Sequence, residues 1–285
     1  MTVLYRHKAS SPVRSDRCTR SGADRWAGRS GRIESMEQLE TAHDVAAATS
    51  EPMLIWAAQA LEDDYPHEAG SAWRLDDAVV VYAPGLNRND RLVFTGGPEA
   101  VAALLGRVPL PREGKLRALG TTESAREVAA RGVTREVGTF GWMDLVGEPV
   151  RGWSAEWLPK PEIDEVAALL ASANPSAYVV PGDPGARRWA GVRDASGALL
   201  SVAADCWPAR ELGFIGGVAT HRRHRGRGLS RQVCGWLTER LYDEHGAVSL
   251  MVDRDNPAAI ALYTRLGFTY RSVTAATVAA VERPA

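Results

Sequence analysis

A basic segment rich in glycine is the part of the sequence best suited to chemistry. Residues 225–230 read RGRGLS and lie between a strand-like run and an amphipathic, helix-like run. Backbone N–H groups at the start of a helix point toward one spot, and the helix dipole adds positive potential there. Glycines at 226 and 228 lack the Cβ atoms that would keep an anion away from the backbone. The segment therefore predicts a binding site for phosphate or pyrophosphate.

The same segment differs from two other phosphate-binding loops. It lacks the Lys-Ser or Lys-Thr pair of a P-loop and the Gly-x-Gly-x-x-Gly spacing of a dinucleotide loop. Five arginines between residues 222 and 231 add positive charge. A solvated basic loop that caps a core helix is the alternative without a ligand, and a contact with nucleic acid is a second alternative.

A further pattern follows the strand-like run at 248–252. Residues 256–268 read NPAAIALYTRLGF. Asn256 suits a helix N-cap, Pro257 the first helical position, and Gly267 a left-handed stop. Tyr263 lies on the apolar face of this helix. It is therefore a candidate for chemistry, or else a packing residue with its hydroxyl at the rim.

Together the two patterns resemble the signatures of the GNAT N-acetyltransferase superfamily. Its pyrophosphate loop has Arg or Gln, two residues, Gly, one residue, then Gly or Ala; Arg225 and Gly228 match, and Ser230 departs from it. Residues 256–268 are similar to the second signature, which ends in Leu-Tyr, three residues and Gly-Phe. The resemblance covers residues 150–275 and is closest to the glycine N-acyltransferase-like branch.

The resemblance implies transfer of acetyl from acetyl-CoA to a primary amine of a small molecule, peptide or protein, by direct attack in a ternary complex. A main-chain N–H near Val218 would stabilise the developing oxyanion. Tyr263 occupies the position of the general acid, and its ordinary pKa near 10 keeps it protonated at neutral pH. The residues implied for the cofactor are Val218, Ala219, Thr220, Arg225, Gly226, Arg227, Gly228, Leu229, Ser230 and Asn256.

The group that deprotonates the attacking ammonium is left open by the sequence. Many relatives carry a Glu near the positions that Gly216-Gly217 occupy here. Two adjacent glycines in a strand predict a bulge or a close backbone approach. Asp205 and Asp253 are the first candidates for the base, because each ends a strand near the expected cleft, and Glu211 and His221 come next. Each of them is alternatively a surface loop residue.

The cysteines indicate a reducing compartment. Cys18, Cys206 and Cys234 are widely spaced and odd in number, which argues against a disulfide framework and against a zinc site. We therefore expect a cytoplasmic protein with no metal. Cys206 could suggest a covalent acyl-enzyme, but a core cysteine at a strand end is the favoured interpretation.

Along the rest of the chain, apolar residues alternate between helix-like and strand-like spacing, which predicts an α/β (α+β) protein. The expected fold is a mixed, mostly antiparallel sheet flanked by helices. Residues 149–285 would form the catalytic domain, with a helix that starts at Pro161. Residues 36–148 would form an earlier α/β domain, compatible with a degenerate GNAT-like copy. Its expected strands are 78–83, 92–94, 116–119 and 134–145, and its expected helices are 52–62, 98–105 and 122–130.

Charge is distributed unevenly along the 285 residues. Residues 1–35 carry eight basic and three acidic residues, so the rest of the chain has a net charge of −6. We expect a disordered basic leader, or translated sequence ahead of a start at Met36. An arm that touches nucleic acid or membrane is the alternative. No nucleic-acid or membrane partner is predicted, since the whole chain is near neutral and has no long apolar run.

Two function classes are compatible with these patterns. The leading hypothesis is an N-acetyltransferase; the alternative is a non-catalytic, CoA-binding regulatory module. The missing strand Glu favours the second class, and Tyr263 favours the first. The identity of the amine acceptor is not predicted, and the resemblance leaves a homodimer open.

Overall fold

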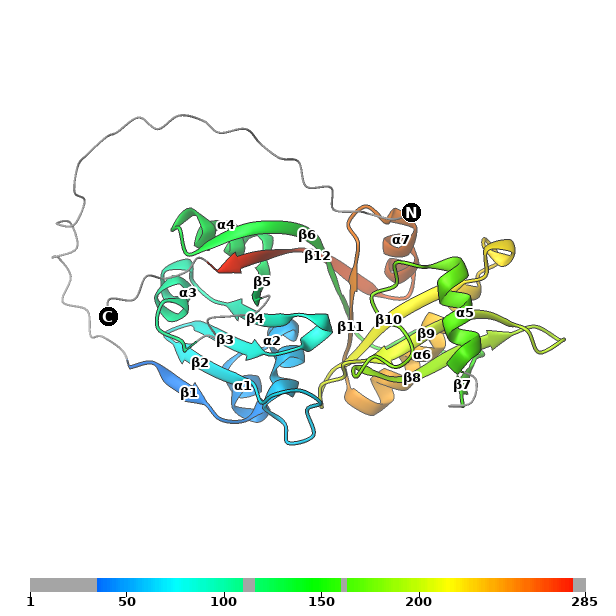
Figure 1. Ribbon diagram of the computed structural model, residues 1–285, viewed down its shortest axis with the longest axis horizontal. Helices are drawn as coiled ribbons and strands as arrows, with labels where there is room; N and C mark the ends of the chain where they lie inside the picture. Colours follow the sequence, from blue (N-terminus) through cyan, green and yellow to red (C-terminus); the bar gives the residue numbers. More distant parts are fainter. Residues whose placement is uncertain (1–34, 110–115, 160–162, 279–285) are drawn as a thin grey trace, which may run out of the picture. The chain divides into compact units, whose positions relative to one another are not determined.

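The computed structural model describes residues 35–109, 116–159 and 163–278 (Figure 1). The predicted leader over residues 1–35, apart from Ser35, and the predicted helix start at Pro161 lie outside these ranges. From Met36 onward the chain forms one compact unit. Within the described ranges, no helix is long and apolar enough to cross a membrane.

The first half of this unit alternates strands and helices as its sequence pattern predicts. The elements are β1 (Glu37–Leu39), α1 (Ala42–Ala48), α2 (Pro52–Ala57), η1 (Ala58–Leu61), β2 (Ser71–Leu75), β3 (Ala78–Ala83), η2 (Leu86–Arg88), β4 (Asp90–Thr95), α3 (Pro98–Leu105), β5 (Leu116–Thr121), α4 (Thr122–Ala130) and β6 (Thr134–Leu145). The helical run predicted over 52–62 is divided between α2 and the 3-10 helix η1. Thr121 is the N-cap of α4, where its side chain accepts a hydrogen bond from the Ser124 N–H.

The second half contains the two patterns singled out in the sequence. Its elements are β7 (Glu156–Leu158), α5 (Ile163–Ala173), β8 (Ala186–Arg193), β9 (Leu199–Cys206), β10 (Gly213–Thr220), η4 (Arg222–His224), α6 (Leu229–His245), β11 (Val248–Val252), α7 (Pro257–Arg265) and β12 (Phe268–Val278). The predicted N-cap is confirmed, because the Asn256 side chain accepts a hydrogen bond from the Ala259 N–H. Gly267 follows α7 with φ +98°, which is the predicted left-handed stop.

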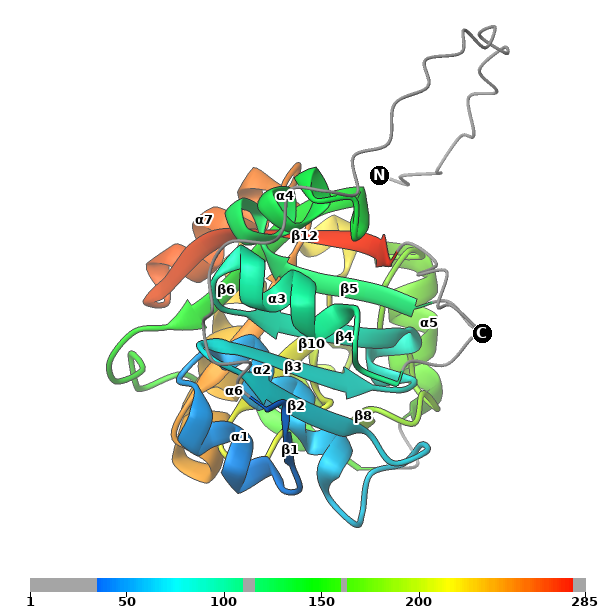
Figure 2. The same ribbon diagram turned by 90° about the vertical axis from the view of Figure 1, so that its left-hand side faces the viewer.

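The twelve strands of the described ranges form one mixed sheet in the order β1-β2-β3-β4-β5-β12-β6-β11-β10-β9-β8-β7. In each half, the strands run from the edge of the sheet to a parallel pair near its centre. This pair is β4 with β5 in the first half and β10 with β11 in the second. The next strand then comes from the other half, since β12 lies beside β5 (Figure 2) and β6 pairs with β11. The halves therefore repeat one strand order and exchange their last strands.

This arrangement confirms the predicted fold class, a mixed and mostly antiparallel sheet flanked by helices, with a second α/β half ahead of it. The boundary predicted between residues 148 and 149 falls between β6 and β7 along the chain. In the sheet, however, β6 and β12 pair with each other along their whole length. Each half therefore contributes a strand to the other.

Helices α5 and α6 cover opposite faces of the second half. Along β9, Val202 belongs to the core cluster that contains Leu169 of α5. Its neighbour Ala203 belongs to the cluster that contains Leu237 of α6. Because side chains alternate between the faces of a strand, the two helices lie on opposite sides of the sheet.

Buried aromatic rings join the two halves on the α5 face. Trp56 of α2 stacks on Phe214 of β10 with ring centroids 4.9 Å apart, and Trp142 of β6 meets both rings. The Trp56 Nε1–H donates to the Trp207 carbonyl at 3.1 Å, so the buried indole has a partner. This cluster fixes the first half against the strands that carry the candidate site.

Candidate functional site

The parallel strands β10 and β11 pair only at their beginnings. The register runs from Gly213 opposite Val248 to Ile215 opposite Leu250 and extends no further in the described residues. Beyond this point β10 pairs with β9 alone, with a register shift between Gly216 and Ala219. The bulge predicted from the two glycines is therefore confirmed. The edge of β10 that faces β11 is left without a ladder partner over residues 216–220.

The bulge explains why no acidic side chain stands on this strand. A Cβ at Gly216 would lie 2.7 Å from the Cys206 Sγ. A Cβ at Gly217, which has φ +57°, would lie 2.5 Å from the Trp189 ring. Neither position has room for a Glu. The departure from the GNAT pattern noted in the sequence is thus built into the packing of β10.

The basic loop after β10 ends in an open helix N-terminus. Gly226 and Gly228 have φ values of +77° and +80°, which favour glycine, and a Cβ at either position would meet nothing within 4 Å. Gly228 is the N-cap of α6 and makes no side-chain capping bond. The first N–H groups of a helix have no intrahelical acceptor. These donors face open space, which suits an anion.

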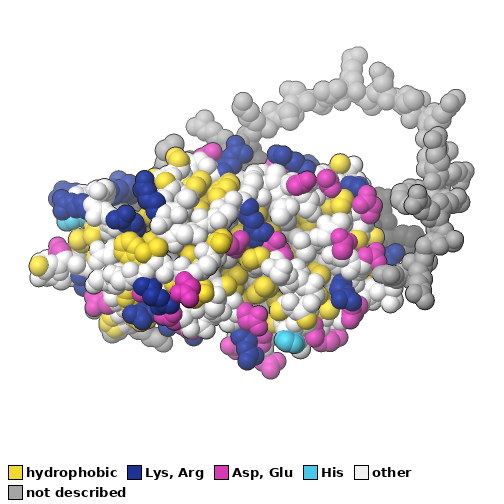
Figure 3. Space-filling model, turned by 180° about the vertical axis from the view of Figure 1, so that it is seen from behind, with side chains coloured by type: hydrophobic (Ala, Val, Ile, Leu, Met, Phe, Trp, Pro, Cys, Tyr) yellow, Lys and Arg dark blue, Asp and Glu magenta, His cyan; other side chains and the backbone are white. Residues whose placement is uncertain are grey.

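The arginines of this loop divide into two groups. Arg225 supports the loop, because its Nη2 donates to the Ala173 carbonyl at 2.7 Å and its Nε to the Thr220 carbonyl at 3.4 Å. Arg222, Arg223 and Arg227 are exposed. Figure 3 shows Lys and Arg side chains gathered with a histidine at the end of the molecule that the second half forms. The positive field predicted from the sequence is therefore presented to solvent.

A chain of hydroxyl groups, which the sequence pattern did not predict, connects the loop helix to β10. The Thr220 Oγ1 lies 2.7 Å from the Ser230 Oγ on one side and 2.7 Å from the Ser201 Oγ on the other. The Ser230 side chain, where the GNAT pattern has Gly or Ala, is the signal that could have indicated it. On the α5 face, the Asn174 Nδ2 donates to the Val218 carbonyl at 3.1 Å. The hydroxyl bonds fix the end of β10 against the first turn of α6, and the Asn174 bond fixes it against the residue that follows α5.

Tyr263 lies inside the protein beneath α6. It is 6% exposed, and its hydroxyl lies 3.8 Å from the Cys234 Sγ of that helix. Burial, with the Cys234 and Cys206 thiols nearby, raises the pKa of Tyr263 well above its ordinary value of 10. The phenol is therefore protonated throughout the neutral range and is able to donate a proton or a hydrogen bond.

Asp253 and Asn256 follow β11 and are exposed. Because Leu250 is opposite Ile215 in the parallel register, Asp253 comes about level with Val218 across the opened strands. The Asp253 Oδ1 accepts only the Asp255 N–H, at 3.3 Å, among the described residues. The structure therefore brings Asp253 to the same end of the two strands as the basic loop. The Asn256 Oδ1 is occupied by its capping bond.

Asp205 is opposite Ile215, level with the point where β10 and β11 begin to separate, but its carboxylate is engaged in an ion pair. It is fully buried, and its Oδ2 accepts from the Arg188 Nε at 2.7 Å. Arg188 also pairs with Glu244, at the C-terminal end of α6. Burial raises the pKa of Asp205, and Arg188 opposes this shift. The hydroxyl chain that reaches Ser230 starts at Ser201, four residues before Asp205 and about 13 Å away along β9. Asp205 ended up here because it pairs with β8, which the sequence pattern does not reveal.

The first half has a corresponding turn, but the protein itself fills it. There β4 leads through Gly96 and Gly97 into α3, and the Gly97 N–H donates to the Asp77 Oδ2 at 2.8 Å. A Cβ on Gly96 would lie 2.5 Å from the Ala78 backbone. This turn carries no arginine, and a carboxylate stands where an anion would bind. An open basic loop is thus present only in the second half of the described chain.

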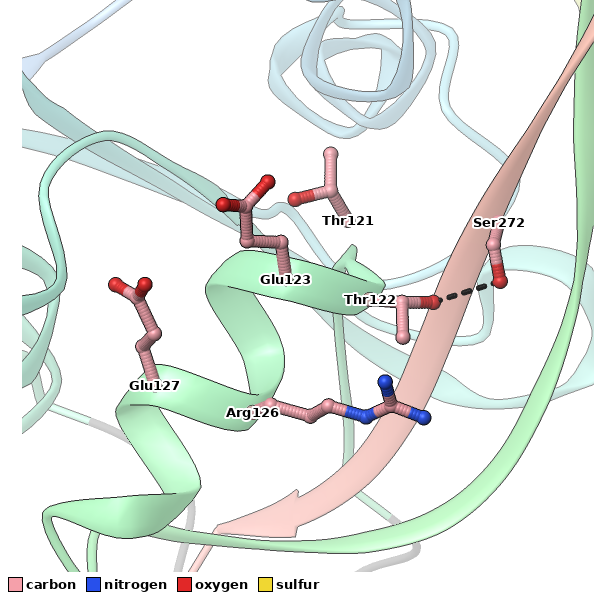
Figure 4. Close-up of a pocket in the computed structure, with 6 residues that line it drawn as sticks. All are labelled: Thr121, Thr122, Glu123, Arg126, Glu127 and Ser272. Carbon is pink, nitrogen blue, oxygen red and sulfur yellow. Dashed lines mark hydrogen bonds between the residues drawn. The ribbon is translucent and has the colours of Figure 1, made fainter.

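A shallow hollow on the first half lies between α4 and β12 (Figure 4). Its lining residues are Thr121, Thr122, Glu123, Arg126, Glu127 and Ser272. The Thr122 and Ser272 hydroxyls share a hydrogen bond of 2.8 Å. The hollow contains neither a thiol nor a histidine and assigns no reaction. Within the part of the chain that is described, no three His, Cys, Asp or Glu side chains are grouped to hold a metal ion.

A comparison with protein families matches the part of the chain that contains the basic loop and Tyr263. Residues 191–277 match the model of the family described as FR47-like protein, which covers less than half of the chain. No curated protein matches the chain.

Solved structures similar to this one have low sequence identity. One is a GCN5-related N-acetyltransferase from Kribbella flavida, with 18% identity, a TM-score of 0.46, and coverage of 70% of this chain and 86% of that one. Another is an acetyltransferase of the GNAT family from Colwellia psychrerythraea, with 12% identity, a TM-score of 0.48, and coverage of 86% of this chain and 100% of that one. A third is a tandem GNAT protein from the clavulanic acid biosynthesis pathway, with 16% identity, a TM-score of 0.48, and coverage of 86% of this chain and 98% of that one. At these identities and TM-scores they assign no activity to this chain.

Proposed function

We propose that this chain is a GNAT-type N-acyltransferase that moves acetyl from acetyl-CoA to a primary amine. The observation that carries the proposal is the opened end of β10 and β11, which is flanked by an uncapped, arginine-rich helix N-terminus. Ile215 and Leu250, where the opening begins, share a core cluster with the buried, protonated Tyr263. The FR47-like match covers these elements.

The loop residues fit the phosphates of acetyl-CoA. The N–H groups at the start of α6 would donate to the pyrophosphate, as helix N-termini do for anions. The exposed side chains of Arg222, Arg223 and Arg227 can neutralise its charge. The unpaired edge of β10 over residues 218–220 offers main-chain groups to the amides of the pantetheine arm. The thioester would then lie between the opened strands.

The transfer needs one bond to form and one to break. The amine nitrogen attacks the thioester carbonyl, and a main-chain N–H near Val218 stabilises the negative oxygen. As the C–S bond breaks, the leaving thiolate takes the Tyr263 proton or a hydrogen bond from it. Asp253, directly or through water, accepts the proton that the attacking nitrogen loses. The raised pKa of Tyr263 keeps the phenol protonated near neutral pH, so its O–H is available to the leaving thiolate.

Acetyl-CoA-dependent release of thiol, measured over a panel of primary amines, tests the proposal. We expect Tyr263→Phe to lower kcat by about 10²-fold or more, the usual contribution of a general acid. Tyr242→Phe, at the far end of α6, is the matched control and should keep its kcat. Thermal unfolding with and without acetyl-CoA reports binding separately.

The second candidate function, a CoA-binding module without transfer, is favoured by one observation. The bulge at Gly216 and Gly217 leaves no room for the acid found in many relatives. Acetyl-CoA would then raise the unfolding midpoint, while no amine would accelerate thiol release. That pair of results would replace the proposed function with this one.

A further inference from the structure

The opened edge of β10 presents the main-chain groups of every second residue. Along a strand, the N–H and C=O of one residue point to one side, and those of the next residue point to the other. The His221 N–H donates to the Leu200 carbonyl of β9 at 2.8 Å, so this residue faces β9. Ala219, two residues earlier in the same register, faces β9 as well. The main-chain groups of Val218 and Thr220 therefore face the opening beside β11.

Both carbonyls that face the opening already accept a hydrogen bond from a side chain of the protein. The Val218 carbonyl accepts from the Asn174 Nδ2 at 3.1 Å, and the Thr220 carbonyl accepts from the Arg225 Nε at 3.4 Å. The N–H groups of Val218 and Thr220 face the same opening, where no strand of the described ranges pairs with them. The edge therefore offers a ligand its N–H donors, while its carbonyls are engaged.

The orientation of the Asn174 side chain is determined by its neighbours. Asn174 directly follows α5, and its main-chain N–H donates to the Leu170 carbonyl at 2.8 Å. Its Oδ1 accepts from the Ser176 Oγ at 3.4 Å. Because a carbonyl can only accept, the amide satisfies Val218 only with Nδ2 toward it. The end of α5 therefore holds a donor in place over the opened edge.

Arg225 ties the same helix end to the edge. Its Nη2 donates to the carbonyl of Ala173, the last residue of α5, at 2.7 Å, while its Nε reaches Thr220. The residue before Val218 is Gly217, which has φ +57° and no side chain to hold the backbone. Contacts from the end of α5 therefore fix this stretch of β10 on its open side.

We propose that Asn174 is a positioning residue, which holds the Val218 carbonyl so that the Val218 N–H stays directed at the acyl oxygen. This inference rests on the proposed function. The pantetheine arm carries two amide carbonyls, and the thioester carries a third oxygen. Each of these oxygens can accept from an N–H of the edge. Without Asn174, the Val218 carbonyl would be free to turn toward these oxygens, and two acceptors facing each other are unfavourable.

Pantetheine and inorganic pyrophosphate test the edge and the loop separately, because pantetheine has no phosphate and pyrophosphate has no arm. Asn174→Leu keeps the size of the side chain and removes its donor. By isothermal calorimetry on the full chain, it should weaken pantetheine about fivefold, the equivalent of one misplaced neutral hydrogen bond. Its affinity for pyrophosphate should stay within twofold. Ser172→Ala removes a hydroxyl bond to the Leu169 carbonyl near the same end of α5; it is the matched control and should change neither affinity.

Kinetics supply a readout that a merely structural role would not move. With acetyl-CoA, Asn174→Leu should lower kcat about tenfold or more, because the donor to the oxyanion is misplaced. Its unfolding midpoint should fall no further than that of Ser172→Ala. If Asn174→Leu unfolds, Asn174→Ala decides by the same comparison.

The outcomes separate this proposal from the proposed function. Unchanged pantetheine affinity and kcat in Asn174→Leu would overturn the positioning role and retain the transferase. Tighter pantetheine binding would show that Asn174 blocks the edge, which also overturns the role. Pantetheine binding that depends on Asn174, without transfer to any amine, would retain the role and reject the transferase. Pyrophosphate binding without any pantetheine binding would reject both.

Discussion

Two glycines at opposite ends of α6 provide a matched test of the anion site. Gly228 precedes the helix with φ +80°, and Gly246 follows it with φ +82°. A Cβ at either position would meet nothing within 4 Å. Gly228→Ala and Gly246→Ala should therefore cause the same backbone strain, about 1–2 kcal/mol. For a unit of this size, that lowers the unfolding midpoint by about 2–8 °C in each variant.

Binding of CoA should distinguish the two variants. At Gly228 the new methyl group occupies the open space before the free N–H groups of the first turn. A hydrogen bond to a charged group contributes about 1.5–3 kcal/mol. Loss of one such bond weakens CoA binding by about 10- to 150-fold, since 1.4 kcal/mol is tenfold. Gly246 lies at the other end of the helix, and Gly246→Ala should bind CoA within twofold of the unmodified protein.

Isothermal calorimetry with CoA and with pantetheine measures both effects. Pantetheine has no pyrophosphate, so Gly228→Ala should bind it as the unmodified protein does. Equal CoA affinity in the two alanine variants would refute the assignment of the loop to phosphate. Equal loss of pantetheine and CoA in Gly228→Ala would show instead that the substitution disturbs β10.

Four further outcomes follow from the geometry. Calorimetry should give one acetyl-CoA per chain, because Asp77 fills the corresponding turn of the first half; a stoichiometry of two would contradict this. The kcat should not fall between pH 9 and 10, because the raised pKa of Tyr263 keeps its proton there; a decline that Tyr263→Phe removes would reverse the assignment. Asp253→Asn should lower kcat at neutral pH, whereas Asp205→Asn should keep kcat within about threefold and lower only the midpoint, since Asp205 pairs with Arg188. Glu51→Ala should lower the midpoint by about 4–8 °C, since it removes about 2 kcal/mol of charged hydrogen bonds to Arg271, whereas Glu37→Ala, in an exposed pair, should shift it by about 2 °C or less.

The features predicted correctly from the sequence depend on short stretches of chain. The Asn256 cap, the left-handed glycines of the loop and the bulge at Gly216 each follow from the conformational needs of one or two residues. The amphipathic helices and the strand runs follow from periodicity. These features suffice to position the loop and Tyr263, which is why the candidate cofactor site was accessible from the sequence.

Features that depend on distant pairing were missed. The position of Asp205 follows from its register opposite Arg188 on β8, and no local pattern encodes a register. The hydroxyl chain likewise joins residues of three different elements, β9, β10 and α6. Positive φ at Asn87 also escaped prediction, because a non-glycine residue carries no sequence signal for that conformation.

The exchange of β6 and β12 bears on what the first half is for. Strand β6 lies between β11 and β12, so the second half without it would have an unpaired gap inside its sheet. Asp77 fills the corresponding turn of the first half, which still supplies β6 and the Trp56 contact with Phe214. Its features are those of a support for the strands that carry the candidate site in the other half.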